Sequence, residues 1–425
     1  MQPSVRDQIV AWIDQDRDAL VQFLSRFVAI PSPNPPGDTT QAAAFLLDHL
    51  HAHGFPAEIR AAESHLPNIV GSFGAGAPHL VLNGHIDVFP SGPISAWSRD
   101  PWSGAVEGNR VHGRGVADMK CGTAASVWTA IYLHRLRARL GGRLTLTCVS
   151  DEETGGTWGA QWLLENFPDE CRGDCLLNGE PSGGTIRFGE KGTLRLVIEI
   201  STPGAHAAYT HLSRNAIVIA AAIVQELMAL EDMPVVQPDA VREAVENARA
   251  AVDAAVGQGG GAILNRVTVC PGVIQGGVKI NMLPGDCRLE VDIRLPVAMT
   301  HEAVMERVDA IIHHHPEARV TPIWTHSSEP TFSDPGHRMV GIIRDTVASL
   351  TGRAAMPAVS LGASDAKHWR RHGVPAYLYG CAPNNMAKPD EWVDVEDYLH
   401  IVRSHALAAA EYLNLAHEVG EVETR

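Results

Sequence analysis

Short apolar runs alternate with segments of helical periodicity through the first part of the chain. The runs at 80–82, 144–149 and 175–177 are short and strongly apolar, which is typical of buried strands. Between them, 122–139 and 157–166 have the spacing of helices. This order of strands and helices predicts an α/β fold with a mostly parallel sheet that is flanked by helices.

The N-terminal segment has an apolar stripe of helical period, so we expect one amphipathic helix there. The stripe consists of Ile9, Trp12, Ile13, Leu20, Leu24 and Phe27. Charged residues interrupt every apolar run in this segment, which excludes a signal peptide. The rest of the chain also lacks an uninterrupted apolar stretch long enough to cross a bilayer, so we expect no membrane partner.

The pattern changes near residue 190. Alternating strands are expected at 194–200, 267–274 and 287–295, with helices at 216–230 and 301–313. This α+β pattern indicates an inserted domain. Segments with candidate catalytic or metal-binding residues resume after it. We therefore predict a discontinuous catalytic metal-binding domain and an inserted lid and dimerisation domain, with the boundaries 1–189 plus 327–425 and 190–326.

Composition narrows the possible partners and the compartment. The 425 residues suggest two domains, and the formal charge of −15 argues against nucleic acid, which needs a basic surface. Seven cysteines at irregular spacing fit no disulfide framework or zinc motif. We therefore expect reduced thiols and a cytoplasmic protein.

Histidine and carboxylate residues follow the three expected strands. His85 and Asp87 come after the first strand, Asp151, Glu152 and Glu153 after the second, and Glu180 after the third. Ligands of parallel sheets bind at the carboxyl ends of the strands, so these residues are expected to share one site. An imidazole with several carboxylates can hold a divalent metal, and a spare carboxylate can act as a base.

Asp118 lies between glycines in the segment 113–122, just before an expected helix. Glycines allow unusual backbone angles, so the carboxylate could be held where it bridges two cations. Taken alone, Asp118 fits a helix N-cap better than a metal ligand, and the acidic run at 151–153 fits a solvated turn as well as a functional site. The order of all these motifs along one chain is the stronger signal.

That order resembles the family of succinyl-diaminopimelate desuccinylase, acetylornithine deacetylase, aminoacylase and glutamate carboxypeptidase. The resemblance is carried by the segments 84–87, 113–120, 150–153 and 179–182, and also by 30–37. It implies a metallohydrolase with one or two divalent ions per subunit. It further implies that His85 and Glu180 bind the first metal and that Glu153 binds the second. Asp118, next to a cis peptide, is expected to bind both metals. Asp87 is expected to support His85, and Glu152 to be the general base and acid.

The inserted segment also resembles the lid of this family. The stretch 204–215 is especially similar to the desuccinylases, and the resemblance implies that His206 reaches into the site of a partner subunit and stabilises the oxyanion. It therefore implies a homodimer. Asn281 and Arg294 are at family positions near the substrate, which is expected to be a small molecule bearing a carboxylate.

One expected ligand is missing near the C-terminus. Relatives carry a histidine four residues before a glutamate, but here Ala387 precedes Glu391. We therefore predict a tightly bound first ion and a weak or empty second site. With few nitrogen ligands, zinc, manganese and cobalt are all expected candidates. His368 is interpreted as a half-buried packing residue that could also contact substrate.

Three functions remain open from the sequence. The first is hydrolysis of the amide of an N-acyl amino acid or short peptide. The second is hydrolytic deamination of an amino-substituted aromatic acid, as in a nitroanthranilate aminohydrolase, to which the resemblance extends. The third is a binding protein that has lost catalysis together with the ligand at Ala387, although retention of Asp87, Glu152 and His206 argues against it.

Overall fold

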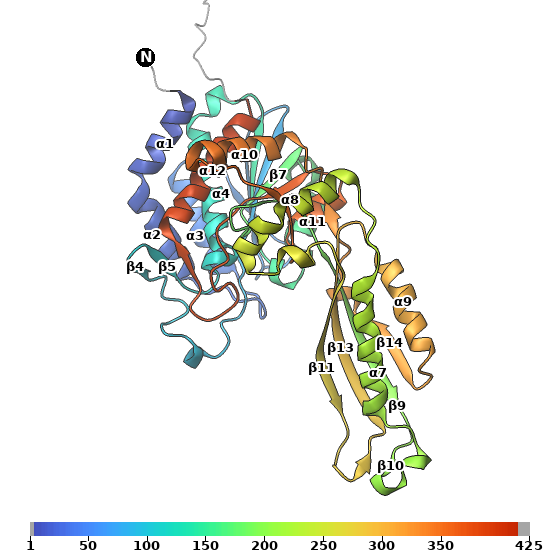
Figure 1. Cartoon of the computed structure of the whole chain (residues 1–425). Coiled ribbons are helices and arrows are strands. Elements are labelled where there is room, and N and C mark those ends of the chain that lie inside the picture. The colour runs from blue at the N-terminus through green and yellow to red at the C-terminus, as the bar shows by residue number, and fades with distance from the viewer. Residues whose placement is uncertain (1–3, 415–425) are drawn as a thin grey trace, which may run out of the picture.

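The computed structural model describes residues 4–414 and shows a broad body from which a long arm extends (Figure 1). The sheet of the body has nine strands in the order β1-β2-β6-β3-β7-β17-β8-β15, with β16 beside β8. Its neighbours β6, β3, β7 and β17 are parallel, which confirms the predicted α/β class. The strands are β1 (Glu58–Arg60), β2 (Asn68–Gly74), β3 (His79–His85), β6 (Arg143–Val149), β7 (Cys175–Asn178), β8 (Ile186–Glu190), β15 (Thr331–Phe332), β16 (Pro357–Ser360) and β17 (Ala376–Leu378).

Helices cover both faces of this sheet because successive side chains of a strand point to opposite sides. In β3, Leu80 and Leu82 enter one core and Val81 enters the other. The first core is covered by α1 (Val5–Gln15), α2 (Arg17–Val28), α3 (Thr40–Ala52), α4 (Cys121–Arg135), α10 (Arg338–Thr351) and α12 (Val395–Tyr412). The second is covered by α5 (Trp162–Asn166), α6 (Pro168–Cys171) and α11 (Ala366–Arg371).

The N-terminal segment forms two helices, α1 and α2, instead of the single helix expected. They are separated by Asp16, whose φ of −87° and ψ of 7° are not helical. The apolar stripe is nevertheless buried, with Ile9, Leu20 and Phe27 fully inside the first core. A break of one residue leaves the periodicity of both halves intact, so the pattern did not reveal it.

The arm has its own antiparallel sheet, in the order β11-β13-β9-β14. Two helices, α7 and α9, pack on it and close a separate core with Leu196, Ile198 and Leu289. The small ladder of β10 with β12 lies at the far tip of the arm (Figure 1). These elements are β9 (Gly192–Ser201), β10 (Ala205–His206), α7 (Ala216–Met228), β11 (Thr268–Gly276), β12 (Met282–Leu283), β13 (Asp286–Leu295), α9 (His301–His313) and β14 (Ala318–Pro322).

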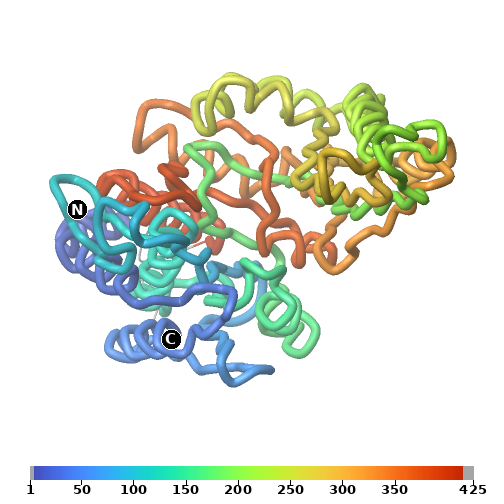
Figure 2. The backbone as a smooth tube through the Cα atoms, turned by 90° about the horizontal axis from the view of Figure 1, so that it is seen from below, coloured from blue at the N-terminus to red at the C-terminus, as the bar shows by residue number. Residues whose placement is uncertain are grey.

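One helix within the predicted insertion packs on the body. Helix α8 (Asp239–Val256) buries Val241, Val245 and Val252 in the first core of the body. In the tube view of Figure 2 the yellow segment that contains α8 lies on the body side of the arm. The chain therefore leaves the arm and returns to it within the range 190–326.

A three-stranded sheet links the C-terminal part of the body to the segment that precedes Asp118. Its order is β18-β5-β4, with β18 (Trp392–Asp394), β5 (Arg110–His112) and β4 (Val106–Glu107). Among the residues that the structure describes, no helix is both long and apolar enough to span a bilayer.

Candidate metal centre

The carboxyl ends of three adjacent strands carry the predicted ligands. His85 is the last residue of β3, and Glu180 follows the end of β7 by two residues. Glu152 and Glu153 lie in the short turn Glu152–Thr154 after β6. Because β6, β3 and β7 are parallel neighbours, their ends meet at one edge of the sheet. The structure thus brings these side chains together.

His85 lies at the centre of the cluster and is fully buried. Its Nε2 is 3.3 Å from Oδ1 of Asp118 and 3.4 Å from Oε1 of Glu180. The same nitrogen is 4.0 Å from Oε2 of Glu152. In the neutral ring, Nδ1 donates to the main-chain oxygen of Asp87 at 2.8 Å. This bond leaves the lone pair of Nε2 directed at the carboxylates, as a metal ligand requires.

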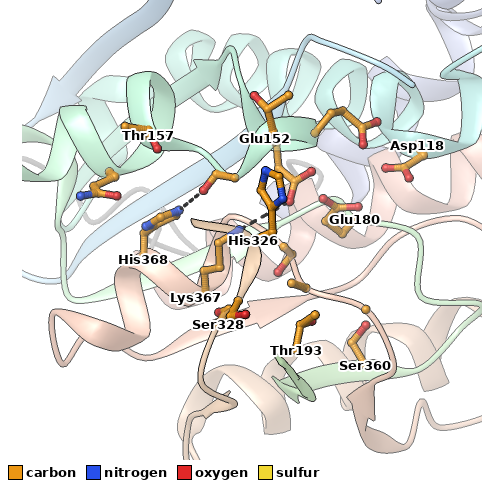
Figure 3. A pocket seen from close by; sticks show the side chains of 18 of the residues that line it. Asp118, Glu152, Thr157, Glu180, Thr193, His326, Ser328, Ser360, Lys367 and His368 are labelled. Atoms are coloured by element: carbon orange, nitrogen blue, oxygen red, sulfur yellow. Dashed lines mark hydrogen bonds and ion pairs between the residues drawn. The ribbon is translucent and has the colours of Figure 1, made fainter. Parts of the chain in front are cut away.

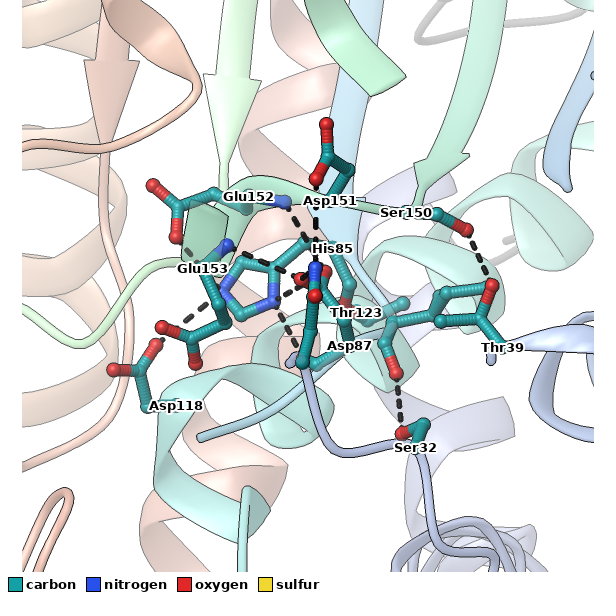
Figure 4. A network of polar contacts seen from close by, with 12 residues as sticks. Ser32, Thr39, His85, Asp87, Asp118, Thr123, Ser150, Asp151, Glu152 and Glu153 are labelled. Atoms are coloured by element: carbon teal, nitrogen blue, oxygen red, sulfur yellow. Dashed lines mark hydrogen bonds and ion pairs between the residues drawn. The ribbon is translucent and has the colours of Figure 1, made fainter. Parts of the chain in front are cut away.

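Asp87 supports the site through both its main chain and its side chain (Figure 4). Its carboxylate accepts the main-chain N–H of Glu152 at 3.2 Å and of Glu153 at 3.1 Å. It also accepts from the amide of Asn34 at 2.9 Å. Sequence spacing suggested that the carboxylate would orient His85. The carbonyl oxygen makes the hydrogen bond to Nδ1, and Oδ1 of the carboxylate lies 3.6 Å from the same nitrogen. The carboxylate also holds the turn of Glu152 and Glu153.

Asp118 enters the cluster from the turn Val116–Lys120, which precedes α4. Its φ of −116° and ψ of 96° are extended, so it is not a residue of the helix. The peptide between Asp118 and Met119 is cis, as the resemblance implied. The carboxylate is directed towards His85, which favours the ligand interpretation over the N-cap interpretation.

The electrostatics of the cluster suit a divalent cation. Burial, and then repulsion by Asp118, raises the pKa of Glu180 to about 8. Burial, and then Asp118, also raises the pKa of Glu153 well above its usual value. The buried Oε1 atom of Glu153 has no hydrogen-bond partner among the residues that the structure describes. A cation would relieve this repulsion and give that oxygen a partner, so the side chains present fit a metal.

The ligand atoms form two overlapping groups whose members all lie within 4.8 Å of one another. One group contains His85, Glu152 and Glu180, and the other contains His85, Asp118 and Glu153. Each group offers one nitrogen and two carboxylate oxygens, a mixed donor set that suits zinc or manganese.

The segment with the missing histidine lies beside the cluster. Ala387 has a left-handed backbone with φ of 61°, and the neighbouring Met386 lines the cavity. Glu391 is fully buried and accepts hydrogen bonds from main-chain N–H groups, including that of Asp118 at 3.3 Å. This segment therefore offers the second ion no side-chain nitrogen or oxygen at position 387.

A cavity of about 780 Å³ opens over the cluster, between the body and the base of the arm (Figure 3). Three of its lining residues come from α11, and Lys367 and His368 are two of them. Lys367 has its Nζ 3.8 Å from Oε1 of Glu152. His368, which was interpreted as a packing residue, is buried, and Nε2 of its neutral ring donates to the carbonyl of Gly155 at 3.1 Å. Burial lowers the pKa of His368 to about 3, so the ring is neutral.

Sequence reasoning missed Lys367. The signal available was its place next to Asp365 and His368 in a short segment rich in ionisable residues. Lys367 is only slightly exposed, at 7% for its side chain. A buried lysine needs a nearby anion, and here that anion is the expected catalytic base.

The three remaining predicted residues are distributed between the two ends of the arm. Arg294, at the end of β13, lines the cavity, and its guanidinium donates to Asp292 and Thr193. His206 and Asn281 lie together at the tip, where the N–H of Ala207 donates to the carbonyl of Asn281. Both are exposed, and Figure 1 shows that β10 is far from the body. One chain does not bring His206 to its own cluster.

Comparisons with known proteins agree with this geometry. Residues 81–411 match the peptidase family M20/M25/M40. The chain is 28% identical over 370 residues to a succinyl-diaminopimelate desuccinylase of Xanthomonas oryzae pv. oryzae, covering 83% of this chain and 89% of that protein. It is 25% identical over 396 residues to a probable succinyl-diaminopimelate desuccinylase of Staphylococcus epidermidis, covering 92% and 96%.

Solved structures share the fold. The M20 family metallo-carboxypeptidase Sso-CP2 of Sulfolobus solfataricus superposes with a TM-score of 0.76 at 18% identity, covering 93% of this chain and 98% of that one. Human carnosine dipeptidase 1 superposes with a TM-score of 0.70 at 16% identity, covering 96% and 100%. Since the family match spans most of the sequence and includes all of the clustered ligands, the chain belongs to peptidase family M20/M25/M40.

Proposed function

We propose that this chain is a metal-dependent hydrolase that cleaves the amide of an N-acyl amino acid or a short peptide. The position of Glu152 carries the proposal. Its Oε2 is 4.0 Å from the metal-facing nitrogen of His85, and its side chain lines the cavity. A carboxylate at the edge of a metal cluster and within reach of substrate is suited to general acid–base work.

The roles of the ligands rest on the two shortest contacts of Nε2 of His85, which are with Asp118 and Glu180. We propose that His85, Asp118 and Glu180 hold the first ion, which can be zinc, manganese or cobalt. Asp118 and Glu153 remain for a second ion. Because Ala387 supplies no donor, we expect the second ion to be bound weakly.

A bound divalent cation lowers the pKa of water and polarises the scissile carbonyl. Glu152 accepts the proton of the attacking water and delivers it to the leaving nitrogen. Asp87 keeps Glu152 in place by accepting its main-chain N–H. We propose that His206 of a second copy donates a hydrogen bond to the developing oxyanion, because hydrogen-bond donors directed at new charge stabilise the transition state.

The walls of the cavity support a substrate with a carboxylate. Arg294 places a positively charged guanidinium on the cavity wall, where it can attract a carboxylate, while its Nε and Nη2 hold Asp292. Asn281 of a second copy would add an amide near the same substrate. Among the described residues that line the cavity, Phe89 is the one aromatic hydrocarbon side chain. The polar lining favours an acyl amino acid over an amino-substituted aromatic acid, and the retained Glu152 argues against a binding protein.

A homodimer would cover apolar side chains near the tip of the arm. Val278 and Ile280 in the loop before β12 are 83% and 100% exposed, and Leu212 and Val218 are 62% and 64% exposed. Exposed apolar residues gathered in one region are typical of protein interfaces. We also propose a cytoplasmic location, because all seven cysteines are free thiols.

The Glu152→Gln substitution tests the proposed function. It preserves the shape of the side chain but removes the base, so turnover of N-acyl amino acids should fall roughly 100-fold or more. Metal content should persist because His85, Asp118 and Glu180 remain. Glu306→Gln, on the exposed face of α9, is the matched control. Retained turnover with Glu152→Gln would remove Glu152 from the mechanism.

A further inference from the structure

Four donors converge on the carboxylate of Glu391. Oε2 accepts from Nη1 of Arg114 at 2.6 Å and from the N–H of Gly115 at 3.2 Å. Oε1 accepts from the N–H of Ala117 at 2.8 Å and of Asp118 at 3.3 Å. Three of the four donors are therefore main-chain groups of the segment that carries a proposed metal ligand.

These contacts are fully enclosed. Glu391 has no exposed surface, and Arg114 is 2% exposed with its guanidinium 5.0 Å from the ring centre of Trp97. A buried charge of this kind is stable only when its partners satisfy it. Removal of the carboxylate would leave the guanidinium and three N–H groups without an acceptor.

The segment 113–118 cannot satisfy these N–H groups by forming a regular helix. Gly113 and Gly115 have φ of 145° and 79°. A Cβ atom on Gly115 would lie 2.1 Å from Cγ1 of Val88, so the main chain packs tightly against its neighbour. The irregular backbone directs three N–H groups to the same side, where the carboxylate of Glu391 accepts their hydrogen bonds.

Glu391 is itself fixed to the body by its neighbours. Its main-chain oxygen accepts from the N–H of Gly113 at 3.0 Å. The next residues form β18, which pairs with β5. On the other side, Oδ1 of Asp390 accepts from both the N–H and the hydroxyl of Ser98, each at 2.9 Å. The carboxylate is therefore held in a fixed position against the segment that carries Asp118.

We propose that Glu391 is a positioning residue, which sets the orientation of the Asp118 carboxylate through the main chain of 113–118. The inference rests on the proposed function, because Asp118 is assigned there as a ligand. With Ala387 at this position, the C-terminal segment supplies no direct ligand there. It instead affects metal affinity indirectly, because Glu391 holds the N–H groups of the segment that orients Asp118. Supporting groups of this kind change metal affinity by roughly 10- to 100-fold.

The test is the Zn²⁺ affinity of the full chain, measured by competition with a chromophoric chelator. In Glu391→Gln one acceptor oxygen becomes an N–H donor facing other donors, so the Kd for Zn²⁺ should rise roughly 10- to 100-fold. Asp390→Asn is the matched control, because its side chain contacts Ser98 and not the segment 113–118. It should bind Zn²⁺ as the wild type does. A folded Glu391→Gln protein with wild-type affinity would overturn the inference.

Hydrogen exchange provides a second measurement if Glu391→Gln does not fold. Glu391→Asp keeps the charge but withdraws the carboxylate by one methylene. In the metal-free protein, exchange in a peptide spanning 111–122 should accelerate, while exchange in α12 stays unchanged. Equal exchange in both proteins would refute the role of Glu391. Absence of Zn²⁺ binding by the wild type would refute the proposed function instead, and the exchange result would still decide the role of Glu391.

Discussion

Lys367 places its ammonium nitrogen 3.8 Å from Oε1 of Glu152 inside the cavity. Burial raises the pKa of Glu152, and the positive charge of Lys367 opposes that rise. The base must be ionised to accept a proton, so Lys367 favours the active form. The two side chains come from α11 and from the turn after β6, which are remote in the sequence.

Replacement of Lys367 should therefore slow the reaction. We expect Lys367→Met to lower kcat/KM at pH 7 about 10-fold or more, because loss of the positive charge leaves a larger fraction of Glu152 protonated. A 10-fold loss corresponds to about 1.4 kcal/mol. Lys367→Arg should retain most of the activity because it keeps the charge. Lys388→Met, in an exposed loop, is the control. Equal kcat/KM for Lys367→Met and wild type, at equal metal content, would rule out this role.

Restoration of the missing donor should increase the number of bound ions. Histidine is tolerated at left-handed backbone angles better than most residues, so Ala387, with φ of 61°, can accept it. We expect Ala387→His to raise the metal content from about one to about two ions per chain, measured by elemental analysis after dialysis. Ala387→Asn, a weaker ligand at the same backbone angle, should remain near one. A wild-type protein that already holds two ions would contradict this expectation.

Mixing two inactive variants should restore activity if His206 acts in a second copy. Glu152→Gln chains lack the base, and His206→Ala chains lack the oxyanion donor. A mixed dimer contains one site with both groups intact, so co-expression should recover up to about a quarter of wild-type turnover if assembly is random. No recovery, although mixed dimers are detected by mass spectrometry, would show that His206 does not complete the site of a partner.

His405 should make the fold sensitive to acid. Its Nε2 donates to the carbonyl of Tyr379 at 2.6 Å, while the buried Nδ1 has no partner within residues 4–414. Burial lowers the pKa of His405 to about 4. The unfolded chain, with a pKa near 6.5, thus binds more protons between pH 6.5 and 4. Stability should therefore fall as the pH falls through this range, by up to about 1.4 kcal/mol per pH unit.

The corresponding measurement is the thermal unfolding midpoint between pH 7 and 4.5. His405→Gln can still donate to Tyr379 but does not titrate, so its midpoint should fall less steeply with acidification. His313→Gln, exposed at the end of α9, should follow the wild type. Parallel curves for His405→Gln and wild type would exclude this linkage.

The sequence was sufficient for the residues at the strand tips and insufficient for those that support them. His85, Glu152 and Glu180 follow apolar runs, so the rule that parallel strands end at one edge was enough to group them. Lys367 and Glu391 reach the site only through packing of α11 and β18. The sequence marked Glu391 only by its place four residues after Ala387 and did not mark Lys367. The contacts of both residues depend on where remote segments meet.

The insertion shows the same limit. The strands of the arm could be predicted because apolar residues alternate with a period of two. Helix α8 has an apolar stripe of helical period, which does not predict which of the two cores buries it. Val241 and Val252 pack in the body, although the surrounding sequence belongs to the arm. An amphipathic pattern predicts a buried face and not the identity of its neighbour.

The position of β17 has a consequence for how the protein is made. This strand lies between β7 and β8, which are close together in the chain, yet it is synthesised long after both. On the ribosome, β7 and β8 must stay unpaired, or form a non-native pair with each other, until β17 emerges. Domains generally fold as units during synthesis, so the body cannot become native before translation is nearly complete, and the nascent chain is then a natural client for chaperones.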